Sequence, residues 1–301
     1  MQACRFKLAR WAAALGGAIL SGAAMRCSPP PGPPPSAQRS PCRPVSGLAE
    51  LLRPGGAVVL LGELHGTEQS PAFVADVLCA AAREGIPVAL GLEIQPAEQA
   101  RIDRYLASGG GAEDRADLLA GPFWRPSLLD GRTSEAMLRL IERARALRAA
   151  GSAVRILAFA PDLPEPGARD RAMADIVAAA ARERPGDLLV AVAGNVHTRL
   201  TVGTSFDSTF VPMGYYLARD LAGRRLVSLR MSYDGGSAWT CRPAEDDENK
   251  IVCGPHPLGP QPGAAAWSVS LDAEPGGPIS GHYGVGALTP SPPVTPPAAS
   301  D

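Results

Sequence analysis

The sequence predicts an α/β fold, with a mainly parallel central sheet, helices on both of its faces and C-terminal antiparallel edge strands. Two observations predict it: short continuous apolar runs typical of buried parallel strands, and helical stretches that alternate with those runs. The strands are expected at 57–62, 87–93, 154–160 and 188–194. The helices are expected at about 71–84, 96–108, 134–150 and 168–184.

Local signals set the helix limits. Pro96 and Glu98 are typical of a first helical turn, and Gly109 follows the last residue of that helix. Gly85 ends the preceding helix and Gly151 ends the third, since glycine favours the position after a helix.

The chain changes character after residue 197. Residues 226–233 alternate in part between apolar and polar, and a strong turn signal follows at 234–236. Short strands are expected at 237–241 and 251–253. We expect this region to extend the sheet as antiparallel edge strands.

The 301 residues divide into four regions. Residues 1–27 resemble an export signal, with a positively charged N-terminal segment and an apolar core too short to span a membrane comfortably. Residues 28–46 form a Pro-rich linker and 47–283 the α/β domain. Residues 284–301 are expected to be a disordered Pro-rich tail.

The export signal predicts a location and leaves two ways of processing open. Cleavage near Ala23 or Ala24 would release the protein into the periplasm, whereas lipidation at Cys27 would anchor it at the cell envelope. That lipid anchor would be its only contact with a membrane. The net charge of -1 gives no field that favours nucleic acid, so no nucleic-acid partner is expected.

Export also affects the interpretation of the cysteines. Cys241 and Cys253 flank a polar segment between two expected strands, which predicts a hairpin disulfide in an oxidising compartment. Cys42 and Cys79 could pair as well, but Cys79 lies on an apolar helix face and is equally compatible with the core.

Acidic and imidazole groups follow three of the expected strands. Glu63 and His65 follow the first strand, Glu93 the second, and His197 the fourth. Because open α/β sheets bind ligands at the carboxyl ends of their strands, we expect these four side chains to form one site.

Two chemistries are open to this set of four. A carboxylate can orient an imidazole that removes a proton from water, which is general acid–base catalysis with Glu63 as base or as partner of His65. The same four side chains could instead bind a divalent metal such as zinc. Asn195 either shapes a turn or contacts substrate. Phe123 and Trp124 either anchor a loop or roof a substrate pocket.

Four short motifs in order resemble the ChaN-like haem-uptake lipoproteins, which are grouped with the Tiki proteases and erythromycin esterases. They are Gly62-Glu63-Leu64-His65, Gly91-Leu92-Glu93, Arg169-Asp170-Arg171-Ala172-Met173 and Gly194-Asn195-Val196-His197. The resemblance covers roughly residues 55–215. Gly66 stands where ChaN-like members usually carry aspartate, and the esterases usually have one more residue between the motif glutamate and histidine.

The resemblance implies a cell-envelope protein with a small-molecule or haem ligand. The leading hypothesis is a hydrolase-like enzyme, esterase- or metalloprotease-like, that uses the Glu/His site. The alternatives are a non-catalytic haem-binding lipoprotein for iron uptake, and an envelope protein that has kept only the fold. Haem binding in the ChaN branch uses tyrosine, for which Tyr105, Tyr215 and Tyr216 are candidates by residue type alone.

Overall fold

The computed structural model describes residues 42–294, apart from residues 54, 164, 245, 246, 248, 272 and 273. These residues belong to one compact unit that begins at Cys42. The predicted export signal, the lipidation candidate Cys27 and linker residues 28–41 lie outside the described residues, as do residues 295–301 of the predicted tail. Among the described residues, no helix is long and apolar enough to cross a membrane.

A seven-stranded sheet forms the centre of this unit, in the order β3-β2-β4-β1-β5-β9-β8. Its strands are β1 (Ala57–Glu63), β2 (Val88–Leu92), β3 (Val154–Ala158), β4 (Leu188–Gly194), β5 (Leu226–Ser232), β8 (Ser268–Ser270) and β9 (Gly281–Gly284). All neighbouring strands run parallel except β8 and β9. The predicted α/β class with a mainly parallel sheet is therefore confirmed.

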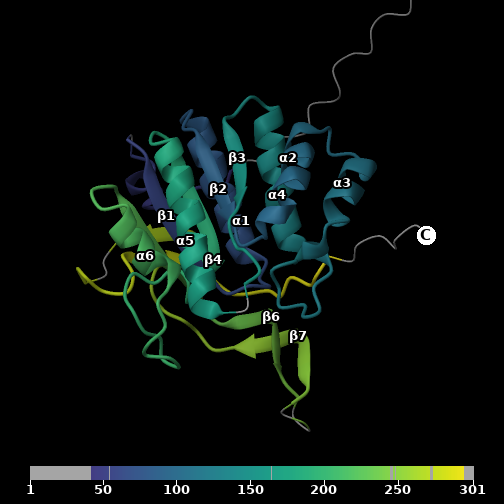
Figure 1. Ribbon diagram of the computed structural model, residues 1–301, viewed down its shortest axis with the longest axis vertical. Coiled ribbons are helices and arrows are strands. Elements are labelled where there is room, and N and C mark those ends of the chain that lie inside the picture. Colours follow the sequence, from purple (N-terminus) through teal and green to yellow (C-terminus); the bar gives the residue numbers. More distant parts are fainter. Residues whose placement is uncertain are drawn as a thin grey trace, which may run out of the picture. The chain divides into compact units, whose positions relative to one another are not determined.

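Helices cover both faces of the sheet (Figure 1). One group consists of α1 (Gln69–Arg83), α2 (Gln99–Ala107), α3 (Ala112–Leu119) and α4 (Glu135–Ala149), and the other of α5 (Pro166–Glu183) and α6 (Met213–Asp220). Short 3-10 helices lie at η1 (Leu48–Glu50), η2 (Pro96–Glu98) and η3 (Pro122–Trp124).

Strand β1 explains this layering, because successive side chains on a strand point to opposite faces. Leu61 packs in the core that contains Phe73 of α1, whereas Leu60 packs in the core that contains Met173 of α5. All seven residues of β1 are buried. Full burial of each leucine side chain contributes about 1.5–3 kcal/mol to stability.

The C-terminal part differs from the sequence expectation in its strand directions. Strands β5 and β9 join the sheet in parallel, and only β8 is an antiparallel edge strand. The reason is α6, which the sequence pattern did not reveal: it carries the chain back between β4 and β5, as a parallel pair requires. Strands β6 (Gly236–Pro243) and β7 (Ile251–Leu258) form a separate antiparallel hairpin, at the bottom of Figure 1.

The domain also extends beyond both of its expected limits. Ser46, placed in the linker, bridges to Ser268. Residues 284–294, expected to be disordered, contain the buried side chains of Leu288 and Val294 and bridge to Thr67 and Ser134. That expectation is wrong for these residues, because prolines that cannot donate hydrogen bonds still accept them, as Pro292 does from Glu135.

Two disulfides are present among the described residues. The predicted bond between Cys241 and Cys253 joins directly opposed residues of β6 and β7. The pairing of Cys42 with Cys79, which the sequence left open, is also formed and ties the start of the described chain to α1. Two disulfides are compatible with an exported protein, since such bonds persist in oxidising compartments.

Candidate active site

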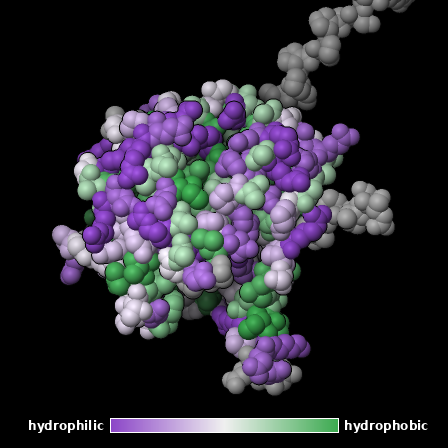
Figure 2. All heavy atoms as spheres, in the orientation of Figure 1, coloured by the Kyte–Doolittle hydropathy of each residue, from purple (hydrophilic) through white to green (hydrophobic). Residues whose placement is uncertain are grey.

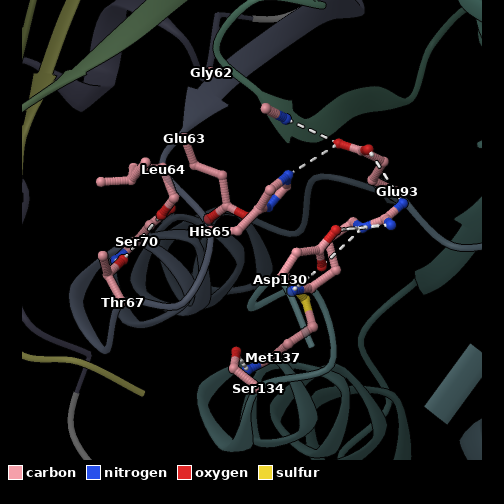
Figure 3. Close-up of polar contacts among 12 residues, drawn as sticks. Gly62, Glu63, Leu64, His65, Thr67, Ser70, Glu93, Asp130, Ser134 and Met137 are labelled. Atoms are coloured by element: carbon pink, nitrogen blue, oxygen red, sulfur yellow. Dashed lines mark hydrogen bonds and ion pairs between the residues drawn. The ribbon is translucent and has the colours of Figure 1, made fainter. Parts of the chain in front are cut away.

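The four side chains predicted to form a site meet at the carboxyl ends of β1, β2 and β4. His65 lies between two carboxylates (Figure 3): its Nδ1 is 2.9 Å from Oε1 of Glu63, and its Nε2 is 3.4 Å from Oε2 of Glu93. Glu63 is thus the partner of the imidazole and orients its ring. Both carboxylates are almost fully buried, while His65 keeps about one fifth of its side chain exposed.

Three glycines make this convergence sterically feasible. A Cβ on Gly62 would lie 2.4 Å from Oγ1 of Thr198, and Gly66 has a φ of 74° with the carbonyl of Trp239 against it. A Cβ on Gly194 would lie 3.2 Å from Nε2 of His65 and 3.5 Å from Cδ2 of His197. Both imidazole rings therefore lie close to Gly194, where a side chain would contact them.

Glu93 is the most densely paired carboxylate of the site. Its Oε2 accepts a hydrogen bond from the Gly194 N–H at 2.9 Å, and its Oε1 accepts one from Arg169 at 2.7 Å. A second guanidinium, that of Arg132, lies 3.8 Å from Oε1. Burial opposes ionisation, but the charge and hydrogen bond of His65, together with the charge of Arg169, hold the pKa of Glu93 well below its usual range.

The same pairing fixes the charge of His65. Burial of the ring works against protonation, but the charge of Glu93 and the hydrogen bonds to Glu63 and Glu93 raise the pKa of His65 to about 10. At neutral pH the ring is therefore an imidazolium. Its second proton is on Nε2, which lies 3.4 Å from Oε2 of Glu93.

His197 has different neighbours. Its Nδ1 lies 2.9 and 3.0 Å from the two oxygens of Asp170, which is fully buried at the start of α5. Asp170 also accepts the backbone N–H of Met213 at 2.8 Å. An ionised carboxylate can only accept hydrogen bonds, so the Nδ1 that faces Asp170 must carry a proton. Asp170 therefore fixes the tautomer of the His197 ring.

The remaining nitrogen of His197 faces a cation. Its Nε2 lies 3.4 Å from NH1 of Arg169, which always donates and never accepts. Nε2 must then present its lone pair, so this arrangement holds His197 as the neutral imidazole. The site thus contains one charged and one neutral ring.

Sequence reasoning found four of these groups and missed three. Asp170 and Arg169 stood in a recognised motif but received no role, although a helix that follows β3 must begin at this same edge of the sheet. Arg132 lies in the segment before α4, bound to Asp130, and no sequence signal marked it.

The predicted substrate-contacting residues are placed differently from one another. Phe123 lines a small pocket beside Glu63, His65, Glu93 and Arg132, together with Ile94, Met137 and Val192. Met137 points from α4 toward this cluster (Figure 3). Trp124 is buried in the core, and the Asn195 N–H donates to the Glu63 carbonyl, which fits the turn-shaping alternative.

The arrangement does not fit a metal-ligand set. Within residues 42–294 as described, no group of three or more His, Cys, Asp or Glu side chains could hold a metal ion. Both oxygens of Glu93 already accept hydrogen bonds, and the guanidiniums of Arg169 and Arg132 would repel a divalent cation. These side chains are therefore not expected to bind a divalent metal ion.

The candidate haem ligands lie away from the site. Tyr105 donates to Glu142 of α4, and Tyr215 and Tyr216 sit on α6 beside Arg219 and Arg171. None of the three tyrosines lines the pocket at Glu93.

Comparisons with known proteins support the fold. No protein-family model and no curated protein matches the chain. A mutant erythromycin esterase in its open conformation aligns with a TM-score of 0.55 and 14% identity, over 70% of this chain and 78% of that one. A Bacillus cereus protein aligns with a TM-score of 0.57 and 14% identity, over 82% and 92%.

Two further structures extend this picture. A succinoglycan biosynthesis protein aligns with a TM-score of 0.57 and 11% identity, over 81% of this chain and 91% of that one. The haem-bound ChaN of Campylobacter jejuni aligns with a TM-score of only 0.41 and 15% identity, over 62% and 84%, which supports no inference. The chain therefore shares the fold that includes erythromycin esterase.

Proposed function

We propose that this chain is an exported hydrolase that cleaves an ester by general acid–base catalysis. The observation that carries the proposal is the pair of imidazoles beside Gly194, one charged and one neutral, each oriented by its own carboxylate. A general base must be neutral and a general acid protonated, and His197 and His65 fulfil these requirements at the same pH. The shared fold with an erythromycin esterase is compatible with this chemistry.

The proposed reaction assigns one step to each ring. Nε2 of His197 removes a proton from water, and Asp170 stabilises the imidazolium that forms. The resulting hydroxide attacks the ester carbonyl, whose developing negative charge is stabilised by His65 and Arg169. The leaving alkoxide takes the Nε2 proton of His65, and the proton held by His197 then restores the resting state through solvent.

The first test is turnover of 4-nitrophenyl acetate by the purified protein. We expect saturable hydrolysis, and a loss of at least about 100-fold in kcat for His197→Gln, because general base catalysis contributes about 10²–10⁴-fold. His282→Gln is the matched control, since His282 lies on β9 outside the pocket, and it should retain full activity.

Two results would contradict the proposal. One is hydrolysis by His197→Gln at the rate of the unsubstituted protein. The other is the absence of saturable hydrolysis together with a saturating Soret change on haemin titration that is lost in His65→Ala or His197→Ala, which would assign these side chains to haem binding.

A further inference from the structure

The guanidinium of Arg132 is only partly used by its neighbours. Its Nε lies 3.1 and 2.9 Å from the two carboxylate oxygens of Asp130, and its NH2 lies 2.8 Å from Oδ2 of the same residue. Among the residues that the structure describes, NH1 donates no hydrogen bond. The carboxylate oxygen beside it, Oε1 of Glu93, is 3.8 Å away and so beyond hydrogen-bond distance. About 30% of the Arg132 side chain is exposed, so the guanidinium can be reached from solvent.

The other guanidinium beside Glu93, that of Arg169, is engaged at both of its terminal nitrogens. Its NH2 donates to Oε1 of Glu93 at 2.7 Å, and its NH1 lies 3.4 Å from Nε2 of His197. Arg169 therefore contributes positive charge to the site while both terminal nitrogens already face protein groups. Within the described part of the chain, Arg132 is thus the guanidinium of this site that keeps an unengaged terminal nitrogen, NH1.

The segment that carries Arg132 is held against the loop that follows β1. Gly131 has a φ of 95°, and a Cβ there would lie 2.5 Å from the Gly66 nitrogen. Trp239 of β6 connects the two segments, because its backbone N–H donates to the Gly66 carbonyl at 2.9 Å and its indole N–H to the Leu129 carbonyl at 3.0 Å. Three segments distant in sequence thus contact one another and position Arg132 before a substrate binds. A donor that is fixed in advance requires little reorganisation in the transition state.

Arg132 and His65 line the same small cavity. Its volume of about 10 Å³ is close to the least that holds one water molecule, so a single oxygen atom fits where a whole carboxylate or phosphate group does not. The cavity also has four apolar walls: Ile94, Phe123, Met137 and Val192. Two carboxylates line it too, but Glu63 is paired with His65, and Glu93 with Arg169. The cavity can therefore stabilise one negatively charged oxygen, in surroundings of low polarity that strengthen each hydrogen bond.

We propose that Arg132 is a further catalytic residue, whose NH1 donates a hydrogen bond to the carbonyl oxygen of the ester. This inference rests on the proposed hydrolase function and adds a residue to its attack step. When hydroxide adds to the carbonyl carbon, the π electron pair moves onto this oxygen, and it returns to form the carbonyl when the alkoxide leaves. Arg132 remains protonated throughout, so the proton transfers stay with His197 and His65.

The first test is the hydrolysis of 4-nitrophenyl acetate by Arg132→Gln. Its kcat should fall at least about 100-fold, as is typical when one donor to a developing oxyanion is removed. Its KM should change by less than about threefold, because the charge that Arg132 stabilises develops only in the transition state. Unchanged kcat in this variant would overturn the proposal.

Arg104→Gln is the matched control. Arg104 binds Asp117 through Nε and NH2, at 3.0 and 2.8 Å, with the same two atoms that Arg132 uses. It lies on α2, over which Figure 2 shows a largely hydrophilic surface, and it does not line the cavity. We therefore expect unchanged kcat and KM in this variant. An equal loss of kcat in both variants would also overturn the proposal.

Chemical rescue separates a catalytic role from a structural one. In Arg132→Ala, guanidinium chloride far below denaturing concentrations should restore part of the lost kcat, because the ion can occupy the place of the missing side chain. Sodium chloride at the same ionic strength should not. A merely structural role would not respond to the added ion. An unrescued variant would therefore assign Arg132 to holding its segment in place and would overturn the proposal.

A binding measurement separates failure of this inference from failure of the hydrolase. The ester 4-nitrophenyl methylphosphonate has a tetrahedral phosphorus with negatively charged oxygens, one of which can enter the cavity. Calorimetric titration should show binding that is at least about tenfold weaker in Arg132→Gln than in Arg104→Gln. Such binding without ester turnover contradicts the hydrolase and retains Arg132 as the donor to an oxyanion. Equal binding by the two variants, or no binding by the unsubstituted protein, overturns the role of Arg132, whatever the turnover.

Discussion

The two histidines of the site have the same kind of partner at Nδ1, but one ring is charged and the other is neutral. Each imidazole receives one carboxylate at Nδ1, Glu63 for His65 and Asp170 for His197, at 2.9 Å in both cases. The difference lies at Nε2, where His65 faces the carboxylate of Glu93 and His197 faces the guanidinium of Arg169. The group at the second nitrogen therefore decides which ring is acid and which is base.

Glu93 and Arg169 also bind each other, at 2.7 Å. The ion pair that separates the two rings thus presents its negative end to one and its positive end to the other. A site with two equivalent carboxylate–histidine pairs would present two rings with the same surroundings. Here the ion pair gives one ring a carboxylate and the other a guanidinium, which suits the different roles proposed for them.

The largest effect on turnover is expected from removing Asp170, the carboxylate partner of His197. Asp170→Asn should lower kcat by about 10³–10⁴-fold, because an amide no longer fixes the Nδ1–H tautomer of His197. Ester turnover with a parallel thermal melt measures this effect. Asp175→Asn, an exposed position on the same helix, is the control and should keep full activity. Equal activity of the two variants would remove Asp170 from the mechanism.

Neutralising Glu93 should remove the main cause of the positive charge on His65. In Glu93→Gln the largest charge that favours protonation of His65 is gone, so the pKa of His65 should fall from about 10 toward 6.5. Turnover at pH 8 should fall about 100-fold, since general acid catalysis then lacks its proton. NMR titration of the His65 ring measures the pKa directly. Glu68→Gln, at a half-buried position paired with Arg139, should leave it unchanged, and an unchanged value in Glu93→Gln would contradict the assigned cause.

The charged ring also predicts a pH dependence of stability. The pKa of His65 is raised on folding, so its contribution is complete below pH 6.5 and is lost as the pH rises toward about 10. The opposite shift of Glu93 adds a loss as the pH falls below 4.5. Urea unfolding should show a decline of a few kcal/mol, on the order of magnitude set by the pKa shift, between pH 6.5 and 10. His65→Gln should lack that decline, and a parallel decline in both proteins would assign it elsewhere.

The smallest effect is expected at Tyr283, whose hydroxyl lies beside the Gly62 carbonyl near Glu63 and His65. Tyr283 is fully buried on β9, where its hydroxyl donates to the Gly62 carbonyl and pairs with Ser70. Burial and the charge of Glu63 hold the pKa of Tyr283 well above its usual value, so the hydroxyl keeps its proton. Tyr283→Phe should cost about 1 kcal/mol of unfolding free energy, with little change in kcat. Tyr215→Phe, at a half-buried position on α6, should cost less, and a large loss of kcat in Tyr283→Phe would place its hydroxyl in catalysis.

The sequence alone predicted the first four strands and the four helices between them closely. The strands expected at 57–62 and 188–194 are β1 and β4, and the helix expected at 134–150 is α4. Long apolar runs with clear end signals carry this information locally. The direction of β5 was missed because it depends on α6, an eight-residue helix too short for its periodicity to be recognised.

The site residues that directly follow a strand were predicted from the sequence, whereas those that lie in or after a loop were missed. Glu63, Glu93 and His197 end apolar runs, so their place at one edge of the sheet follows from topology. Asp170 lies near the start of α5 and Arg132 in the segment before α4, and their approach to His197 and Glu93 depends on packing between elements distant in sequence. The pairing of Cys42 with Cys79 is of the same kind, since nothing local brings Cys42 to α1.

That second disulfide determines how the domain would bear a mechanical load. A pull on residues 1–41 enters the domain at Cys42, and the bond to Cys79 transmits it to the C-terminal half of α1. Helix α1 packs in the core with β1 and against α4. The force is therefore distributed over these packed elements and does not detach the segment before β1. Reducing this bond would leave residues 43–56 as the first segment to yield, while the site at the far end of β1 would still be held.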